Sequence, residues 1–229
     1  MPPLSASKKE ALMQVPLFKT LTPAELEAIS AHATIRSQKR GSTILRKGGP
    51  ATDMIVILQG RVRIGVVTEE GKEVTLRVFG PGEVVGEISL LDGKERSADV
   101  IALEDCVLLS VERSHFLSLL RASSDLCLRL MASLCERIRR TSLSLEEAIA
   151  LDLPTRLGRH LRRMAEEYGV RVPGGTKIGV KLSQSDLAGL VGASREKVNR
   201  QLRAWEAEGA ITRQGGYFIL LRPEALPGA

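Results

Sequence analysis

The sequence is poor in the residues on which several classes of protein depend. Only 3% of its 229 residues are aromatic, which argues against a surface that holds single-stranded RNA by stacking on its bases. Its three cysteines, Cys106, Cys127 and Cys135, form no CxxC pair and no even disulfide framework, as is usual in a reducing cytoplasm. The sequence has no apolar run of membrane-spanning length and no apolar signal-peptide core near its first residue. These features predict a soluble, cytoplasmic protein without a membrane partner.

The patterns of common catalytic and metal sites are also missing. The sequence contains no Walker loop, no nucleophile beside a base and no histidines at metal-ligating spacing. An iron–sulfur cluster needs four cysteine ligands, and His32, His115 and His160 lie in no pattern that would support an axial haem ligand. We therefore expect neither an enzyme nor a metal-binding protein.

What the chain does have is enough apolar residues to fold and a basic C-terminal part. Hydrophobic residues make up 43% of the sequence, so disorder is not expected. The net charge is +6, and from Leu151 onward there are 13 Lys and Arg residues against 8 Asp and Glu. A basic region of this kind is typical of a domain that binds nucleic acid.

The stretch Leu182–Ala207 has the pattern of two short helices joined by a turn. Ser183 and Asp186, three residues apart, form a capping-box pattern at the start of the first helix. Gly192-Ala193 permits a tight turn, and Ser194 is placed to cap the second helix. This layout predicts a helix-turn-helix, whose second helix enters the major groove of DNA.

The second helix has one apolar and one polar face. Val198, Leu202 and Trp205 recur at helical spacing and should point inward. The residues expected on the outward face are Arg195, Glu196, Asn199, Arg200 and Arg203. Arginine matches the two acceptors of guanine and glutamate can accept from cytosine. The alternative is a solvated charged face, but the caps, the turn and both faces agree with DNA reading.

The N-terminal part is expected to be mainly β. Two short helices broken at Pro16 should lie between Lys9 and Ser30, the second capped by Thr22 ahead of Pro23. Glycine-punctuated, β-branched runs then extend from Ala33 to Val111, and a turn is predicted at Glu69-Glu70-Gly71-Lys72. The clearest strands are Met54–Leu58, Arg61–Thr68, Glu73–Phe79 and Asp99–Val111. Many short strands of this kind predict a barrel or jelly roll.

A helical zone should run from Ser114 to Ala150, with a break around Ser123-Ser124. Apolar residues in this zone follow steps of four and three, which is a heptad seam that also includes one serine. The seam comprises Met131, Cys135, Ile138, Ser142, Leu145 and Ile149. It predicts a dimer helix, the alternative being one amphipathic helix packed on its own domain. Because a helix-turn-helix usually acts as a dimer on two half-sites, we favour the dimer.

The last third of the chain begins at a hinge, Asp152-Leu153-Pro154. A helix is predicted from Thr155 to Glu167, and Pro173-Gly174-Gly175 is expected to be a loop. After the helix-turn-helix, Ile211–Leu221 should form a hairpin that turns at Gln214-Gly215-Gly216. The C-terminal part is therefore predicted to be a winged helix.

A glycine-bounded segment of the β part, Gly82–Ala98, could approach a ligand closely. Glu87 could accept a hydrogen bond from a ribose hydroxyl, and Arg96 with Ser97 could hold a phosphate. On spacing alone, a surface ion pair between Glu87 and Arg96 on a β-turn is the commoner explanation.

Over nearly its full length, the chain resembles the cAMP receptor protein branch of the CRP/FNR transcription regulators. The order of parts is similar, and GEISLLDGKERSADV resembles the family's phosphate-binding cassette. The resemblance implies an α+β architecture with a cyclic-nucleotide-binding β-roll over residues 1–122, a dimerisation helix over 123–150 and a winged helix-turn-helix over 151–229.

The resemblance also implies the roles of individual residues. Gly86, Glu87, Arg96 and Ser97 match the cassette, in which the glutamate binds the ribose hydroxyl and the arginine-serine pair holds the cyclic phosphate. Arg137 falls where the family has an arginine that supports this glutamate. Thr141 and Ser142 match a Thr-Ser pair that contacts adenine, the serine from the partner chain. The implied effector is cAMP, without a metal.

ASREKVNR resembles the recognition helix of the same branch, which implies base reading by Arg195, Glu196 and Arg200. At Lys197 and Asn199 the best-known member of the branch has different residues, and both side chains could touch DNA. The rest of the expected DNA-binding set is Ser183, Ser194 and Arg203. The implied protein is a homodimeric transcription regulator, as an activator or a repressor, that binds double-stranded DNA at TGTGA-like half-sites and works with RNA polymerase. A family member that is active without nucleotide is the nearest alternative; a cyclic-nucleotide-gated module of another protein and a plain DNA-architectural protein fit less well.

Overall fold

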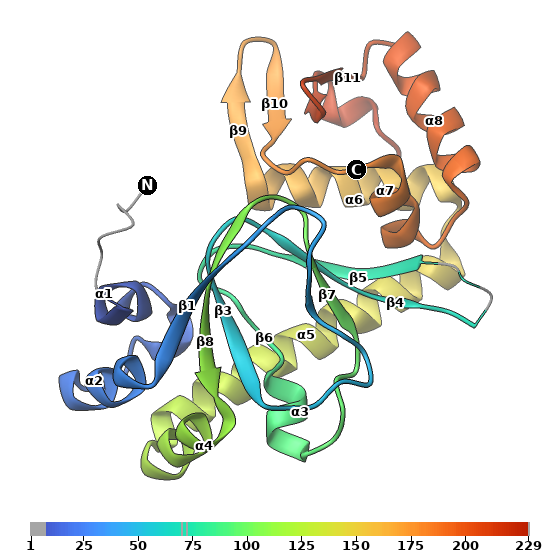
Figure 1. Cartoon of the computed structure of the whole chain (residues 1–229). Helices are drawn as coiled ribbons and strands as arrows, with labels where there is room; N and C mark the ends of the chain where they lie inside the picture. The colour runs from blue at the N-terminus through green and yellow to red at the C-terminus, as the bar shows by residue number, and fades with distance from the viewer. Residues whose placement is uncertain (1–7, 70, 72, 229) are drawn as a thin grey trace. The chain divides into compact units, whose positions relative to one another are not determined.

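The computed structural model describes residues 8–69, 71 and 73–228, and Figure 1 shows the order of their helices and strands. The chain forms two compact units. The first runs to Ile64 and takes in Val78–Arg139, and the second holds Gly65–Arg77 and everything from Arg140 onward. In the described part of the chain, no helix is both long and apolar enough to cross a membrane.

The N-terminal helices are α1 (Lys8–Met13), a 3₁₀ turn η1 (Pro16–Phe18) and α2 (Pro23–Ala31). The Thr22 hydroxyl accepts a hydrogen bond from the main-chain N–H of Glu25, and the Glu25 side chain accepts one from Thr22. The predicted break at Pro16 and the predicted cap at Thr22 are therefore confirmed.

Two four-stranded sheets form the β part. The described strands are β1 (Ala33–Gln38), β2 (Thr43–Leu45), β3 (Asp53–Gln59), β4 (Val62–Val67), β5 (Glu73–Phe79), β6 (Val84–Val85), β7 (Asp99–Ala102) and β8 (Cys106–Glu112). One sheet has the order β1-β8-β3-β6 and the other β2-β7-β4-β5. The single strand predicted over Asp99–Val111 is wrong, because the chain leaves one sheet after Ala102 and enters the other sheet at Cys106. Of the predicted turn after β4, residues 70 and 72 lie outside the described residues.

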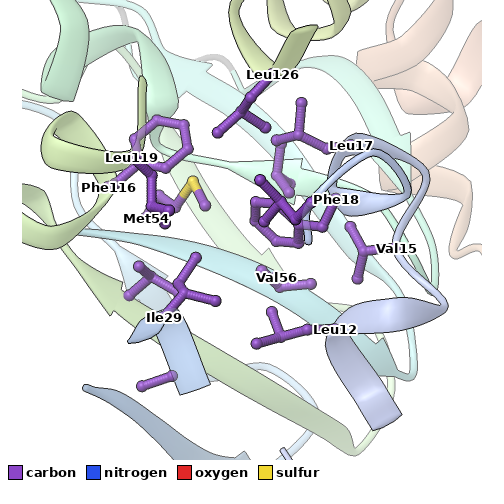
Figure 2. Packing of buried hydrophobic residues seen from close by; sticks show 14 of the residues in the cluster. Leu12, Val15, Leu17, Phe18, Ile29, Met54, Val56, Phe116, Leu119 and Leu126 are labelled. Carbon is purple, nitrogen blue, oxygen red and sulfur yellow. The ribbon is translucent and has the colours of Figure 1, made fainter. Parts of the chain in front are cut away.

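The central strand β3 is buried on both faces, which explains its unbroken apolar run. Met54 and Val56 pack into a cluster with the N-terminal helices, α4 and α5, part of which Figure 2 shows. Ile55 and Ile57 point the other way, into a cluster shared by strands of both sheets. Successive side chains of a strand point to opposite faces, so this strand joins the two halves of the core.

The same part of the chain has three more helices: α3 (Glu87–Asp92) between β6 and β7, and α4 (Arg113–Ala122) and α5 (Ser124–Ala150) after β8. The break between α4 and α5 falls at Ser123, as predicted, and α5 is continuous over 27 residues. Helix α3 was not expected from the sequence.

The second unit contains the winged helix that the sequence predicts. It comprises α6 (Leu153–Tyr168), β9 (Gly169–Val172), β10 (Gly175–Ile178), α7 (Gln184–Val191), α8 (Arg195–Ala207), β11 (Ile211–Gln214), β12 (Tyr217–Leu220) and a 3₁₀ turn η2 (Pro223–Ala225). Its sheet has the order β11-β12-β10-β9. The Asp152 side chain accepts from the N–H of Thr155, so α6 begins at the predicted hinge.

Candidate functional site

The first candidate site is a pocket at the start of α3. Gly86 precedes this helix with a φ of +87°, and a Cβ atom at Gly86 would lie 2.7 Å from Nη1 of Arg96. Glycine is required here both for the left-handed backbone and for the close approach of the guanidinium.

The pocket brings together five of the seven residues predicted to bind the effector. These five are Gly86, Glu87, Arg96, Ser97 and Arg137. The rest of the lining is mostly apolar and comes from the second sheet, from α3 and from the residue before β7: Leu45, Ile64, Ile88, Ser89, Ala98 and Val100. A concave, mostly apolar lining with a few convergent polar groups is the usual form of a small-molecule site.

Glu87 is the acidic group of this pocket, and it is only 1% exposed. Its Oε1 forms an ion pair with Nη1 of Arg137, whose Nη2 donates to the main-chain oxygen of Val84 at 2.7 Å. The Arg137 guanidinium also lies over the ring of Phe79, 4.8 Å from its centre. Glu87 is therefore held from α5, fifty residues further along the chain.

The second carboxylate oxygen of Glu87, Oε2, is buried and has no hydrogen-bond partner among the described residues. Burial raises the pKa of this carboxyl above its ordinary value, although the charge of Arg137 opposes the shift. A buried acceptor without a partner is costly unless something donates to it. Glu87 can therefore accept a hydrogen bond from a ligand hydroxyl.

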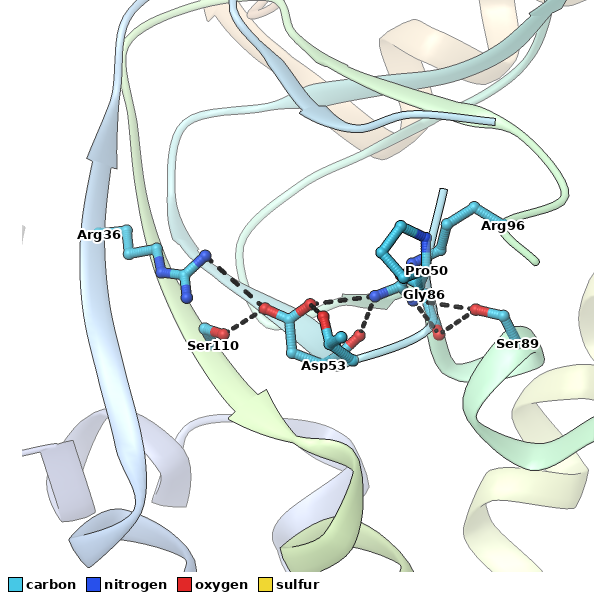
Figure 3. A network of polar contacts seen from close by, with 8 residues as sticks. Arg36, Pro50, Asp53, Gly86, Ser89, Arg96 and Ser110 are labelled. Carbon is cyan, nitrogen blue, oxygen red and sulfur yellow. Dashed lines mark hydrogen bonds and ion pairs between the residues drawn. The ribbon is translucent and has the colours of Figure 1, made fainter. Parts of the chain in front are cut away.

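Arg96 is also buried, at 4% exposure, and Figure 3 shows its surroundings. Nε donates to the main-chain oxygen of Pro50 at 3.2 Å, and Nη1 donates to the Gly86 oxygen at 2.8 Å and to Ser89 Oγ at 2.9 Å. Nη2 donates to the main-chain oxygen of Asp53 at 2.5 Å and to its Oδ1 at 3.0 Å. A guanidinium has five N–H donors, so protein acceptors take all of them in this structure.

Asp53 is the charged partner of Arg96, and it stands at the first position of β3. Its carboxylate also accepts a hydrogen bond from Ser110 on β8 and lies 3.8 Å from Nη1 of the half-exposed Arg36. Burial lowers the pKa of Arg96, with the charges of Asp53 and Glu87 acting in the other direction. The surface ion pair between Glu87 and Arg96 is therefore wrong as an explanation, because both are buried and each has a different main partner.

The other two predicted effector residues, Thr141 and Ser142, lie further along α5. They follow Arg137 by four and five residues in the same continuous helix, and both are exposed. They belong to the second unit, and the residues that line the pocket do not include them.

The apolar residues of the predicted seam on α5 are exposed as well. Met131 is 51% exposed, Ile138 66% and Ile149 79%. A row of exposed large apolar side chains on a long helix is unusual for a monomer. The alternative of a helix that buries this seam against its own domain is therefore wrong for these residues.

The second candidate site is the helix pair α7–α8. The Ser183 hydroxyl accepts from the N–H of Asp186, whose carboxylate accepts from Ser183, so the predicted capping box is present. Ser194 accepts from the N–H of Lys197 at the start of α8. Gly192, with a φ of +65°, makes the turn between the helices.

Helix α8 buries the apolar face that the sequence predicts. Val198, Leu202 and Trp205 are at most 3% exposed. The residues of its other face that are exposed are Arg195, Glu196, Lys197, Arg200 and Arg203. Asn199 is half-buried instead, and its Oδ1 accepts from Gln184 Nε2 at 2.6 Å, so it bridges α7 and α8.

Both candidate sites overlap segments of the chain that match known protein families. Residues 35–123 match the family model of the cyclic nucleotide-binding domain, and residues 155–227 match that of the Crp-like helix-turn-helix domain. The Cyclic AMP receptor protein of Thermus thermophilus is 32% identical over 211 residues, which cover 92% of this chain and 94% of the relative. The chain belongs to the CRP/FNR family of transcription regulators.

Two further similarities agree with membership of the CRP/FNR family. The CRP-like cAMP-activated global transcriptional regulator of Mycobacterium tuberculosis is 28% identical over 95% of this chain and 97% of its own length. The structure of the c-di-GMP responsive global regulator CLP of Xanthomonas campestris superposes with a TM-score of 0.75 at 26% identity, over 87% of this chain and 99% of that one. The chain is thus a CRP/FNR regulator with a cyclic nucleotide-binding domain and a helix-turn-helix domain.

Sequence reasoning missed Asp53 and Ser89, which hold Arg96. The only available indication was a lone carboxylate one residue before the apolar run predicted as Met54–Leu58. Asp53 and Arg96 are 43 residues apart, and no local pattern connects them.

Proposed function

We propose that this CRP/FNR regulator responds to cAMP and binds DNA as a homodimer at a palindrome of TGTGA-like half-sites. The observation that carries the proposal is the unpartnered Oε2 of Glu87, buried in a pocket that also holds Arg96, Ser97 and Arg137. A ribose 2′-hydroxyl would satisfy this acceptor, and the cyclic phosphate would lie toward Ser97 and Arg96. The relatives named for cAMP support this choice of effector.

Dimerisation would cover the exposed apolar seam of α5 and complete the effector site. In a parallel pair of these helices, Met131, Ile138 and Ile149 would pack against their counterparts. Ser142 lies on the same seam, so we propose that the serine of one protomer and Thr141 of the other contact the adenine. The hydroxyl groups of this pair are the donors and acceptors that a purine edge requires.

DNA reading is assigned to α8. We propose that Arg195, Glu196 and Arg200 contact base edges, while Lys197, Arg203 and the capped helix starts at Ser183 and Ser194 contact the backbone. Asn199 holds α8 against α7 through Gln184, so its role is to position the recognition helix. We include recruitment of RNA polymerase in the same proposal, and only the membership of the family supports it.

The effector would act by shifting a population. A ligand that binds the DNA-competent state better increases that state, and DNA must in turn tighten ligand binding by the same factor. We place the change at the end of α5 and the capped hinge Asp152, where α6 begins. Two recognition helices would then lie about 34 Å apart, in successive major grooves.

A regulator that is active without nucleotide is the second candidate, and one observation favours it. All five N–H donors of Arg96 are already bound by protein acceptors, so a phosphate must displace at least one of them. The Xanthomonas regulator that responds to c-di-GMP also makes that nucleotide a necessary comparison.

The test is fluorescence anisotropy of a labelled TGTGA-N6-TCACA duplex, titrated with protein at fixed salt with cAMP, cGMP, c-di-GMP or no nucleotide. Strong tightening by cAMP alone is the expected result. Equally tight, sequence-specific binding without nucleotide would support the second candidate. A Glu87→Gln variant that responds to cAMP as strongly as the wild type would overturn the role of Glu87.

A further inference from the structure

Two lysines and a tyrosine form a cluster beside the wing of the second unit, which is the hairpin of β11 and β12. The ammonium groups of Lys177 and Lys181 lie over the ring of Tyr217, at 4.7 and 5.1 Å from its centre. Both distances are within the range of cation–π attraction. One aromatic ring therefore lies close to two positive charges in a protein with few aromatic residues.

The strands explain why these side chains meet. Lys177 on β10 pairs with Ile219 on β12, so Tyr217 is the diagonal neighbour of Lys177 on the same face of the sheet. Lys181 follows β10, and the space beside Gly216 is bounded by its aliphatic chain, 3.8 Å from where a Cβ would stand. The cluster thus links the wing turn to the segment that leads into α7.

Neither lysine has a carboxylate partner among the residues that the structure describes. The carboxylate of Glu206 on α8 pairs with Arg213, and that of Asp186 caps α7. Two like charges repel each other, so their placement on one ring is favourable mainly when an anion joins them. None of the carboxylates that the structure describes supplies this anion, so we look for it in a binding partner.

The position of the cluster indicates which anion this is. Lys181 stands two residues before Ser183, the N-cap of α7. In a helix-turn-helix the first helix crosses the DNA backbone while the second enters the groove, and lysines and helix N-termini are the usual phosphate contacts. The wing turn at Gly215-Gly216 lies beside Lys181 in the same unit.

We infer that Lys177 and Lys181 bind phosphates of the DNA backbone beside the groove that α8 reads, with Tyr217 as the platform that positions them. This inference rests on DNA binding through α8, and it adds a contact outside the recognition helix that carries no base specificity. An acidic protein surface is the competing partner, and the experiment separates the two.

The experiment measures DNA affinity against salt concentration for the wild type and the double variant Lys177→Gln/Lys181→Gln. It uses both the TGTGA duplex and a random duplex, because phosphate contacts contribute to both. Each lost phosphate contact makes the slope of log K against log salt shallower by about 0.9. A dimer would lose four contacts, so the expected change is about 3.6 on each duplex. Between about 50 and 200 mM salt, the variant should then lose roughly 150-fold less affinity than the wild type.

Lys19→Gln is the matched control, since Lys19 is an exposed lysine of the first unit. It removes one positive charge per chain, as each of the two substitutions of the double variant does, and it should leave the slope unaltered. Tyr217→Ala should weaken binding by freeing both lysines, and Tyr217→Phe should restore the affinity. Thermal unfolding of each variant checks that the second unit remains folded.

Equal slopes for the wild type and the double variant on both duplexes would overturn the inference and leave the lysines to an acidic protein surface. Failure of the wild type to bind either duplex at the lowest salt would overturn it as well. Failure of the proposed function gives a different pattern, in which cAMP has no effect while the salt slopes still differ.

Discussion

Replacement of Asp53 tests whether the buried ion pair with Arg96 holds the effector pocket in shape. The side chains of the pair are 10% and 3% exposed. In Asp53→Ala the guanidinium keeps the main-chain oxygens of residues 50, 53 and 86 and the Ser89 hydroxyl as acceptors, so four of its five hydrogen bonds remain. What the variant loses is the only carboxylate that the structure shows bonded to this charge.

Breaking a buried pair by removal of one partner costs about 3–5 kcal/mol, because an uncompensated charge stays behind. Since most hydrogen bonds of Arg96 survive, we expect a value near the lower end, about 3 kcal/mol. The matched control is Arg36→Ala, which removes an exposed cation 3.8 Å from the same carboxylate. An exposed partner contributes about 0–1 kcal/mol, so this variant should be nearly as stable as the wild type.

The assay measures thermal unfolding by scanning calorimetry, with and without saturating cAMP. Tryptophan fluorescence is unsuitable, because the single tryptophan, Trp205, lies in the second unit. If the cyclic phosphate binds Arg96, it replaces the missing charge, and cAMP should stabilise Asp53→Ala more than the wild type. Equal stability of the Asp53 and Arg36 variants would refute the reasoning about the pair. Equal stabilisation of Asp53→Ala and the wild type by cAMP would show that the phosphate does not reach Arg96.

Three further predictions concern single residues. Burial raises the pKa of Glu87, whereas a ligand hydroxyl donates best to the ionised carboxylate. The affinity for cAMP, measured by calorimetry, should therefore fall as the pH drops through that pKa. The Glu87→Gln variant should lose this pH dependence, and a variant that keeps it would show that the assignment is wrong. Burial, helped by the charge of Arg163, lowers the pKa of His160 from 6.5 to about 4, so the unfolded state binds more protons between these values. The stability from neutral His160 is thus complete above 6.5 and falls by about 3 kcal/mol as the pH drops to about 4; a His160→Gln variant with the same acid sensitivity as the wild type would contradict this. Ser183→Ala should lower the free energy of unfolding by about 1 kcal/mol, because α7 loses its cap. Ser183→Asp should keep the cap and weaken DNA binding, because it places a negative charge near phosphates. Equal DNA affinity of the two variants would exclude Ser183 from the interface.

The helix-turn-helix could be predicted closely because its determinants are local. A cap at Ser183, a turn at Gly192 and an inward face of Val198, Leu202 and Trp205 depend on residues within a few positions of one another. The position of Asn199 was not predictable in the same way. Its outward spacing is correct for a helix, but its half-buried bond to Gln184 depends on how α8 packs against α7.

The β part was harder to predict because pairing between distant segments decides it. Strands β2 and β6 have three and two residues, too few for a recognisable alternation. The run Asp99–Val111 reads as one strand, yet it contributes β7 to one sheet and β8 to the other. The pocket residues Glu87 and Arg96 could be named from the cassette, but their partners come from β3 and α5, far away in the sequence.

The place of Arg137 in α5 connects the pocket with the rest of the regulator. Arg137 holds Glu87, and the chain passes from the first unit to the second between Arg139 and Arg140, less than one helical turn later. Thr141 follows one turn after Arg137 on the same side of a continuous helix. We expect a ligand hydroxyl that binds Glu87 to alter its ion pair with Arg137, and so to act on a segment that passes from one unit to the other. Allosteric coupling requires an element that both sites bias, and this turn of α5 is the element on which we expect effector and DNA to act.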